Sequence, residues 1–599
     1  MALLVTATLL APPSAAPLSA QETDDSPTVT AADAARADEY LTRLEAFGLA
    51  GGVLVAKDGR VLLAKGYGLA DRGDAEGPPR PWTAATVSTV GSITKQFTAA
   101  GIMKLAEEGA LSVTDSLGRF FDGVPAEKRA ITLHHLLTHT AGFGGVAEGD
   151  FDFLSREEIV EKALASELLS EPGEEYRYSN LGYSLLGAVV EVVTGEEYEA
   201  WMRENLFRPA GMYETGYVLP GYEPARVATG YRGEERWGTV VERIEADRGP
   251  SWVLRANGGV HTTLHDMHRW VRALGVLESD DDTAEARPAL LTRESRERMF
   301  TPHADEGGGT FYGYGWVVAE TPWAGPVLAH DGGNGILFSN LILFPDHGLE
   351  TFMMTSASDF RATWLLRRID RILFGEEVPM PPAVETTRVA PATLERLAGR
   401  YRLEGGGELE VVSRGSALAI HVVGQPAVDR VWTGEPVGSV PYAELNRRAE
   451  RFARAFGAGD YSTMRSMMGP DTPAEPFRSY RERLLARYGP IEEVEALGTV
   501  PAWFHGGSSE VTWLRIRFER DSRIRRIHWL EDGTVEGVGG EVYPAPLTLR
   551  CAMTAPDACT GWHEGLETGE PTVSFSPGSL TIRTPAGEVR ARPMEAGGG

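Results

Sequence analysis

Strand-forming sequence brackets a long helical region in the first 376 residues of the chain. The stretch GGVLVAKDGRVLLAKGYG, residues 51–68, alternates apolar and polar residues around an Asp-Gly turn, which predicts a β-hairpin. Strand patterns return only near residue 311, in FYGYGWVVAE, FSNLILFPDHG and ETFMMTSAS. Distant strands that flank helices favour an α+β fold, with an antiparallel sheet and a helical lobe, over residues 38–376.

The rest of the chain predicts further domains, as 599 residues are too many for one core. A Pro-rich linker is expected at 377–395. Short strands predict a β-rich C-terminal domain made of 396–437 and 545–599. Between them, 438–544 combines amphipathic helices with long strands. This pattern is typical of a small, cone-like α+β module, and its position in the sequence makes an insertion into the β-rich domain one of the alternatives.

The N-terminal residues indicate export to the periplasm or the extracellular space. Residues 1–20, MALLVTATLLAPPSAAPLSA, are apolar and end in small residues, as a signal peptide does. Residues 21–37 are polar and are expected to form a flexible lead. No later stretch is long and apolar enough to cross a bilayer, so we expect no integral membrane segment in the mature chain.

The two cysteines, Cys551 and Cys559, lie close together in CAMTAPDAC. In an exported chain such spacing favours a disulfide that closes a short loop. A metal pair is less favoured because no further ligand lies nearby in the sequence, and a pair of free thiols is the third alternative.

The charge balance argues against a nucleic-acid partner and against binding to an anionic membrane. The formal net charge is −27, whereas phosphate binding needs clustered cationic charge. The Arg-rich stretch RIRFERDSRIRRI is therefore interpreted as a solvated face.

One lysine stands out because lysine is rare in this chain. Only six of the 58 basic residues are lysine, and only Lys95 has a serine, Ser92, three positions before it. Positions i and i+3 share one helix face, so the two side chains can touch at the start of the helix predicted from Ser92 to Gly109. A serine nucleophile needs an adjacent base, which a deprotonated lysine can provide. The alternative is a helix N-cap serine beside a solvated lysine.

Two further short patterns add groups suited to acyl transfer. Tyr178 is the only one of 18 tyrosines followed two residues later by asparagine, Asn180. A phenol can move protons as general acid and base if a nearby lysine charge lowers its pKa, and an amide can bind a substrate. The alternative is a turn asparagine beside a packed tyrosine.

The second pattern is LAHDGGNG, which contains His330, Gly332 and Gly333 at the expected end of a strand. Glycines let backbone N–H groups approach a ligand closely. The N–H groups of Gly333 and Ser92 are therefore candidates for an oxyanion hole. The alternative is a glycine-rich hairpin.

These motifs, with ITLHHLLTHTAGF, LFRPAGMYET, ANGGVHTTLHDMHRW and YGYGW around them, resemble the serine β-lactamase and penicillin-recognising family. The closest subgroup is the class C β-lactamase-like serine hydrolases, which includes esterases and D-amino-acid peptidases. The resemblance implies that Ser92 is the acylated nucleophile, Lys95 its proton acceptor and Tyr178 the general base. It also implies that Asn180 binds the substrate amide and that His330 holds the third-motif position.

One departure from the family pattern bears on the substrate. No lysine follows Lys162, so the Lys-Thr/Ser-Gly motif is absent, and His330-Asp331-Gly332 stands in its place. The cation that would bind a β-lactam carboxylate is gone, and Asp331 adds negative charge. We therefore expect a small-molecule ester or a peptide as substrate, with no cofactor. The alternatives are a β-lactamase, a D,D-carboxypeptidase or D-aminopeptidase, and a non-catalytic cell-envelope binding protein.

Histidine spacing raises metal binding as a further possibility. His135 and His139 are four residues apart, as are His261 and His265, with His268 close behind. No His-Glu-x-x-His motif is present, so no metal site is predicted. Trp252, Trp270 and Trp316 are interpreted as core residues, and Trp316, in YGYGW, is also a candidate for lining the cleft.

Overall fold

The computed structural model describes residues 29–594. The segments outside the described residues within that range are 74–76, 145–147, 233–234, 246–249, 278–288, 308, 322, 357–359, 415–416, 434–441, 470–474, 502–509, 540–546, 564–569 and 585–586. The predicted signal peptide, residues 1–20, also lies outside the described residues. The chain divides into two compact units, built mainly on Leu49–Val378 and Pro379–Gly599.

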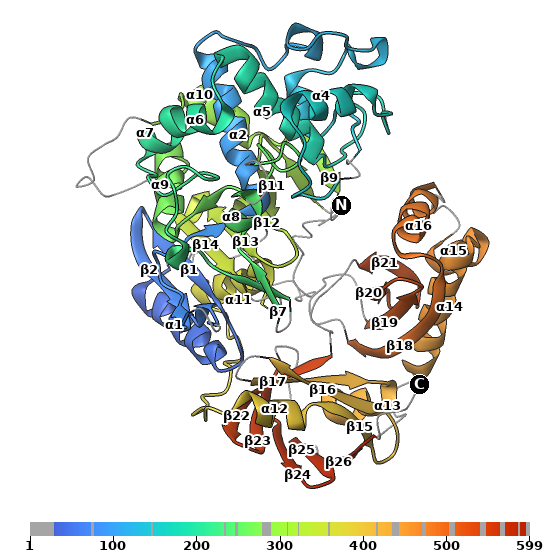
Figure 1. Ribbon diagram of the computed structural model, residues 1–599. Coiled ribbons are helices and arrows are strands. Elements are labelled where there is room, and N and C mark those ends of the chain that lie inside the picture. The colour runs from blue at the N-terminus through green and yellow to red at the C-terminus, as the bar shows by residue number, and fades with distance from the viewer. Residues whose placement is uncertain are drawn as a thin grey trace, which may run out of the picture. The chain divides into compact units, whose positions relative to one another are not determined.

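The first unit is built on one antiparallel sheet of eight strands (Figure 1). Its order is β2-β1-β14-β13-β12-β11-β10-β9, so β1 from the start of the unit pairs with β14 from its end. The predicted α+β fold is thereby confirmed for this unit. The strands are β1 Gly51–Lys57, β2 Arg60–Tyr67, β9 Ala304–Gly307, β10 Thr310–Tyr312, β11 Val317–Thr321, β12 Gly325–Gly333, β13 Phe338–Phe344 and β14 Leu349–Thr355.

Helices cover both faces of this sheet. Glu350 of β14 bonds to His268 of α9, whereas the next residue, Thr351, lies near Asp370 of α11. Because successive side chains of a strand point to opposite faces, α9 and α11 lie on opposite sides. The helix α1 contacts both β2 and α11. The helices of this unit are α1 Ala31–Glu45, α2 Thr94–Glu107, α3 Leu133–Leu137, α4 Arg156–Ala165, α5 Asn180–Thr194, α6 Tyr198–Met202, α7 Arg208–Ala210, α8 Val240–Glu245, α9 Leu264–Leu274, α10 Arg293–Phe300 and α11 Ala362–Leu373.

The helical lobe lies between the two strand groups in sequence. The helices α2, α3, α4 and α6 all contact α5, which is buried along most of its length. Short pairs and turns connect these helices, namely β3 Leu69–Asp71, β4 Arg80–Pro81, β5 Ser88–Thr89, β6 Gly230–Arg232, β7 Glu235–Gly238, β8 His261–Thr262, η1 Gly91–Ile93, η2 Leu117–Arg119, η3 Ala126–Lys128, η4 Arg203–Phe207, η5 Pro224–Arg226 and η6 Pro345–His347. The tryptophans Trp252, Trp270 and Trp316 are buried, and Trp316, which is 0% exposed, does not line a cleft.

The flexible lead predicted for residues 21–37 is too long. Helix α1 begins at Ala31, where the alanine-rich sequence AADAARADEY has high helix propensity. Its apolar face buries Ala34, Ala37 and Tyr40, so packing holds this helix in place.

The second unit contains a closed barrel of eight strands, which confirms the predicted β-rich C-terminal domain. The chain leaves the barrel after β17 and returns at β22, and these two strands pair directly with each other. The intervening sequence therefore lies between two neighbouring barrel strands. The barrel strands are β15 Gly399–Leu403, β16 Glu408–Arg414, β17 Ala417–Val423, β22 Thr548–Ala555, β23 Ala558–Trp562, β24 Thr572–Ser576, β25 Ser579–Thr584 and β26 Gly587–Pro593.

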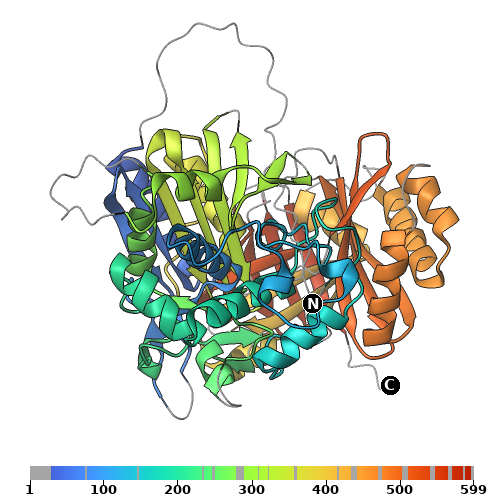
Figure 2. The same cartoon turned by 90° about the horizontal axis from the view of Figure 1, so that it is seen from above.

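The intervening sequence forms a four-stranded antiparallel sheet with three helices packed beside it (Figure 2). Its apolar core includes Phe452, Met464 and Trp529. The elements are α14 Tyr442–Ala458, α15 Tyr461–Met468, α16 Glu475–Tyr488, β18 Ile491–Pro501, β19 Glu510–Phe518, β20 Ser522–Trp529 and β21 Val535–Gly539, preceded by α13 Gln425–Val428 and η7 Asp429–Thr433. A further helix, α12 Pro391–Leu397, occupies the end of the predicted linker.

The predicted disulfide between Cys551 and Cys559 is not formed, and both are buried free thiols. Cys551 lies opposite Gly561 and Cys559 lies opposite Met553, so the two cysteines are diagonal neighbours on β22 and β23. Diagonal residues lie about 7–8 Å apart, beyond the separation of about 4.4–6.8 Å between Cα atoms that a disulfide needs. The two thiols still contact each other: burial raises the pKa of Cys559 well above its ordinary value, and a hydrogen bond with Cys551 adds to this shift. Sequence spacing alone does not reveal this register.

No helix in the described part of the chain combines the length and the apolar character that a membrane span needs.

Candidate active site

Ser92 lies in the single 3-10 turn that leads directly into α2. The turn is pressed against the end of β12. A Cβ atom on Gly91, whose φ is +50°, would lie 2.4 Å from the Gly333 nitrogen, and one on Gly332 would lie 2.7 Å from the Ser92 nitrogen. Only glycine permits this approach, so two backbone segments 240 residues apart meet beside the Ser92 side chain.

Lys95, the second residue of α2, is fully buried and contacts the Ser92 hydroxyl. Its Nζ lies 3.3 Å from Ser92 Oγ, 2.8 Å from Asn180 Oδ1 and 2.7 Å from the Asn257 carbonyl oxygen. Burial lowers the pKa of Lys95 well below its ordinary value, and the charges of Asp150 and Asp331 only partly oppose this shift. An amine with a lowered pKa can accept a proton near neutral pH.

Tyr178 completes a contiguous group with Ser92 and Lys95. Its phenol is hydrogen-bonded to Ser92, and the Lys95 Nζ lies 4.7 Å from the centre of its ring. The next residue, Ser179, caps α5 by accepting a hydrogen bond from the Gly182 N–H at 3.3 Å. The start of α5 thus places Tyr178 and Asn180 on either side of the cap residue.

The pKa of Tyr178 differs from what the sequence led us to expect. Burial raises it, and the hydrogen bond from Ser92 opposes this shift only in part. The expected lowering by a lysine charge does not occur because the pKa of Lys95 is itself lowered. The phenol is therefore protonated in the resting site.

His330 faces the same aromatic cluster from β12. Its Nε2 lies 2.9 Å from the Tyr312 hydroxyl and its Nδ1 lies 2.6 Å from the Asp331 carbonyl oxygen. Burial lowers the pKa of His330 to about 3. His330 is therefore a neutral ring and is no substitute for a fixed cation.

The end of β12 leaves one N–H group free to face Ser92. The Asn334 N–H bonds to the Leu337 carbonyl oxygen, so by the alternation of an antiparallel ladder the Gly333 N–H points away from β13. The pairing of β12 with β11 ends at Ala329. The Gly333 N–H therefore points toward the side where the Ser92 turn lies.

Asp331 adds less negative charge to the site than its position in the motif suggests. Its Oδ2 accepts a hydrogen bond from Thr363 at 3.3 Å, and Arg361 and Arg367 favour its charged form. These partners belong to α11 or directly precede it. Because successive strand residues face opposite sides, Asp331 lies on the face opposite His330.

Three residues of the site were not assigned from the sequence. The Asn257 carbonyl contacts Lys95, the His139 ring packs at a tilt against Tyr178 with centroids 4.2 Å apart, and Tyr312 bonds to His330. Of these three, only His139 was considered as a candidate ligand, because it lies four residues after His135 in the sequence. Those two histidines instead accept hydrogen bonds from backbone N–H groups, at 3.0 Å from Ser179 to His139 and at 3.3 Å from Thr132 to His135.

The other closely spaced histidines differ in their surroundings, and His265 is exposed. His261 is buried, and His268 bonds to Glu350 at 2.6 Å. Within the described residues, no group of three or more His, Cys, Asp or Glu side chains is arranged to hold a metal ion.

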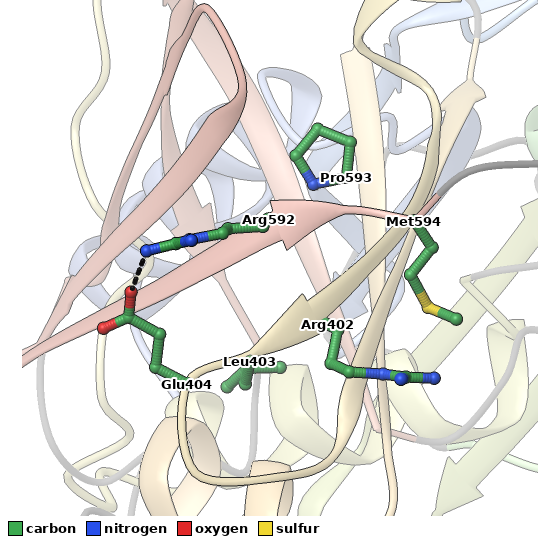
Figure 3. Close-up of a pocket in the computed structure, with 6 residues that line it drawn as sticks. All are labelled: Arg402, Leu403, Glu404, Arg592, Pro593 and Met594. Carbon is green, nitrogen blue, oxygen red and sulfur yellow. Dashed lines mark hydrogen bonds and ion pairs between the residues drawn. The ribbon is translucent and has the colours of Figure 1, made fainter.

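A pocket in the second unit is lined by residues at the ends of β15 and β26 and directly after them (Figure 3). Arg592 pairs with Glu404 at 3.5 Å, and the arginine side chain is 78% exposed. The pocket contains no buried polar group and no nucleophile, so it offers no chemistry comparable to that around Ser92. Its lining residues are Arg402, Leu403, Glu404, Arg592, Pro593 and Met594.

Comparison with known proteins places this geometry in a family. The chain is 29% identical over 397 residues to penicillin-binding protein 4* of Bacillus subtilis, covering 63% of this chain and 84% of that protein. It is 29% identical over 351 residues to penicillin-binding protein 4 of Amycolatopsis lactamdurans, covering 54% and 86%.

Among solved structures, the octameric penicillin-binding protein homologue from Pyrococcus abyssi matches with a TM-score of 0.50 at 18% identity. The match covers 93% of this chain and 100% of that one, and it shows a shared fold. The model of the beta-lactamase family matches residues 35–371. This chain therefore belongs to the beta-lactamase family, whose members include penicillin-binding serine hydrolases.

Proposed function

We propose that the protein is an exported serine hydrolase, of the class C β-lactamase-like type, that cleaves an ester or amide bond through an acyl-enzyme on Ser92. The observation that carries the proposal is the contact between the Ser92 hydroxyl and a fully buried Lys95. The other Lys95 partners are the oxygens of Asn180 and Asn257. A neutral amine can donate to these two oxygens and direct its lone pair at Ser92.

Acylation begins when Lys95 takes the proton of Ser92 and Ser92 Oγ bonds to the substrate carbonyl carbon. The resulting oxyanion is held by the N–H groups of Ser92 and Gly333. Tyr178 then gives its proton to the leaving group as the bond to that group breaks. The phenolate that remains lies beside the protonated Lys95, which stabilises it by charge attraction.

Deacylation reverses these proton movements. The Tyr178 phenolate takes a proton from water, and the hydroxide attacks the acyl carbon. Ser92 Oγ leaves and recovers its proton from Lys95. The net reaction adds one water molecule across the scissile bond, and every side chain returns to its starting state.

The remaining roles follow from position. Asn180 reaches Lys95 through its carbonyl oxygen, so its NH₂ group is available to the substrate amide. His330 and Gly332 shape the opposite wall, next to Tyr312. No cofactor enters this scheme. Cleavage after Ala20 would support export, and intact-mass measurement of secreted protein tests it.

A serine-reactive fluorophosphonate probe tests the nucleophile. We expect stoichiometric labelling of the wild-type protein and none of Ser92→Ala. Labelling that persists in Ser92→Ala would refute the assignment, and a folded wild-type protein that forms no adduct would favour the non-catalytic binding protein. Nitrocefin turnover distinguishes a β-lactamase, and release of D-alanine from a D-alanyl-D-alanine peptide distinguishes a D,D-carboxypeptidase.

A further inference from the structure

The residue before Asn257 has an unusual backbone conformation. Ala256 has a φ of +68°, in the left-handed region that glycine tolerates and that residues with a Cβ atom avoid. Alanine has no polar side-chain group that could favour this conformation, so contacts from the surroundings must hold it. The backbone angles of Ala256 determine where the chain points next, and the next carbonyl oxygen, that of Asn257, lies 2.7 Å from Lys95 Nζ.

Two side-chain hydroxyls bond to the backbone of Ala256. The Ala256 N–H donates to the Tyr217 hydroxyl oxygen at 2.7 Å, and the Ala256 carbonyl oxygen accepts from the Thr98 hydroxyl at 2.6 Å. All three residues are buried. Loss of either hydroxyl would therefore leave a buried backbone group without its partner, and the backbone around Ala256 would have to move to find another.

Thr98 acts from the same helix as Lys95. It lies three residues later on α2, so the two side chains share one face of the helix. Lys95 contacts the Asn257 carbonyl oxygen, and Thr98 contacts that of Ala256. The hydroxyl of Tyr198 lies 2.6 Å from Thr98 Oγ1 and is the donor in that contact, because the single Thr98 proton points to Ala256. Helix α2 thus holds two successive carbonyl groups of one turn.

Helix α5 supports this turn from a second side. Asn257 Nδ2 donates to Ser184 Oγ at 2.9 Å. A Cβ atom on Gly187 would lie 2.5 Å from the Ala256 Cβ, so the Ala256 methyl group packs directly against α5. The left-handed turn is thus held by α2 and α5, the two helices that also carry Lys95 and Asn180.

We infer that Thr98 and Tyr217 are positioning residues for Lys95. By holding Ala256 in its left-handed conformation, their hydroxyls direct the Asn257 carbonyl oxygen at the amine. The inference rests on the proposed hydrolase function and deepens it, because it adds two residues that act on the proton acceptor only through this carbonyl.

The direction of the Lys95 lone pair is the reason that this carbonyl matters. A neutral amine has two N–H bonds and one lone pair. The oxygens of Asn180 and Asn257 accept both N–H bonds of Lys95, which leaves the lone pair for the Ser92 proton. If the Asn257 carbonyl turns away, the amine can rotate and present an N–H to Ser92 instead. Proton transfer from Ser92 then slows, whereas binding of the substrate changes little.

The fluorophosphonate probe tests this inference, because its reaction with Ser92 needs the proton transfer but no knowledge of the substrate. The rate constant at saturation, kinact, reports the chemical step, and the half-saturating concentration, KI, reports binding. Thr98→Val removes the hydroxyl at nearly constant shape, whereas Thr98→Ser keeps it. We expect Thr98→Val to lower kinact by about tenfold or more with KI within about twofold, and Thr98→Ser to keep kinact within about threefold of wild type.

Tyr217→Phe is the second variant, and it decides the question if Thr98→Val does not fold. It removes the acceptor of the Ala256 N–H but keeps the ring, and we expect the same loss of kinact at constant KI. Thr194→Val and Tyr67→Phe are the matched controls. The Thr194 hydroxyl bonds to a backbone carbonyl at the end of α5, and the buried Tyr67 hydroxyl bonds to a carboxylate on α1. Both controls should retain the wild-type kinact.

The wild-type protein separates the two possible failures. If folded wild-type protein is not labelled, the proposed function and this inference fall together. If it is labelled, and the folded Thr98→Val and Tyr217→Phe proteins react with wild-type kinact, only the inference is overturned, because hydroxyls that merely stabilise the fold would give this result. A loss of kinact that also occurs in Thr98→Ser or in the controls overturns it as well. Circular dichroism verifies the folding of every variant.

Discussion

The approach of Gly332 to the Ser92 turn offers a sharp test of the catalytic geometry. A Cβ atom at position 332 would lie 2.0 Å from the Val90 carbonyl oxygen and 2.7 Å from the Ser92 nitrogen. Both are backbone atoms, and real Cβ contacts are essentially never shorter than 3.0 Å. In Gly332→Ala, β12 and the turn must therefore separate by about 1 Å (3.0 − 2.0) at Val90.

The Val90 carbonyl has little freedom to move. It accepts hydrogen bonds from Ser339 Oγ at 2.7 Å and from the Ile93 N–H at 3.2 Å. The substitution should therefore displace the N–H groups of Gly333 and Ser92, which we propose as the oxyanion hole. Loss of one such donor costs about 10²–10³ in kcat, or about 2.7–4 kcal/mol of transition-state stabilisation.

The assay is steady-state hydrolysis of p-nitrophenyl acetate, with circular dichroism to verify folding. We expect Gly332→Ala to lose at least a hundredfold in kcat, with a smaller change in KM. Gly118→Ala is the matched control, because its new Cβ would meet only Ser116 Oγ, at 4.0 Å. A folded Gly332→Ala enzyme with kcat within threefold of wild type would refute the assignment of these N–H groups.

Three further predictions concern titration and the buried thiols. Because burial lowers the pKa of Lys95, we expect kcat/KM to be constant from neutral pH upward and to fall only at acid pH. Lys95→Arg should be inactive at every pH from 5 to 10, because arginine stays protonated. Burial raises the pKa of Asp370 from 3.8 to about 7, so the folded state retains a proton that the unfolded state has lost. The free energy of unfolding, measured with urea, should thus fall as pH rises from 4 to 7, by up to about 4 kcal/mol from this group, and Asp370→Asn should flatten that slope. Cys551 and Cys559 should react with a thiol reagent only after unfolding, and rapid reaction of the native protein would contradict their burial.

The sequence predicted the elements that depend only on residues close to one another along the chain. Alternation around the Asp-Gly turn predicted the β1–β2 hairpin, and helical spacing after Ser92 predicted α2, which ends at Glu107. The spacing of Ser92 and Lys95 predicted their contact because an i, i+3 relation is a property of the helix itself. Their meeting with Tyr178 and β12 depends on tertiary packing, and there the family resemblance was needed.

The features that escaped prediction depend on burial or on register. The Asn257 contact uses a carbonyl oxygen that every residue has, so no residue type marks it. The raised pKa of Tyr178 depends on how deeply α5 places it. The Cys551–Cys559 offset depends on strand register.

The scarcity of lysine bears directly on the role of Lys95. The chain uses arginine at 52 of its 58 basic positions (58 − 6), yet it keeps lysine at a position that is 0% exposed. An arginine there would stay charged and would carry the full cost of a buried ion. A lysine escapes that cost by losing its proton, and the same loss makes it a base for Ser92. The burial that excludes a permanent cation from this position thus also prepares the amine for the catalytic role that we propose.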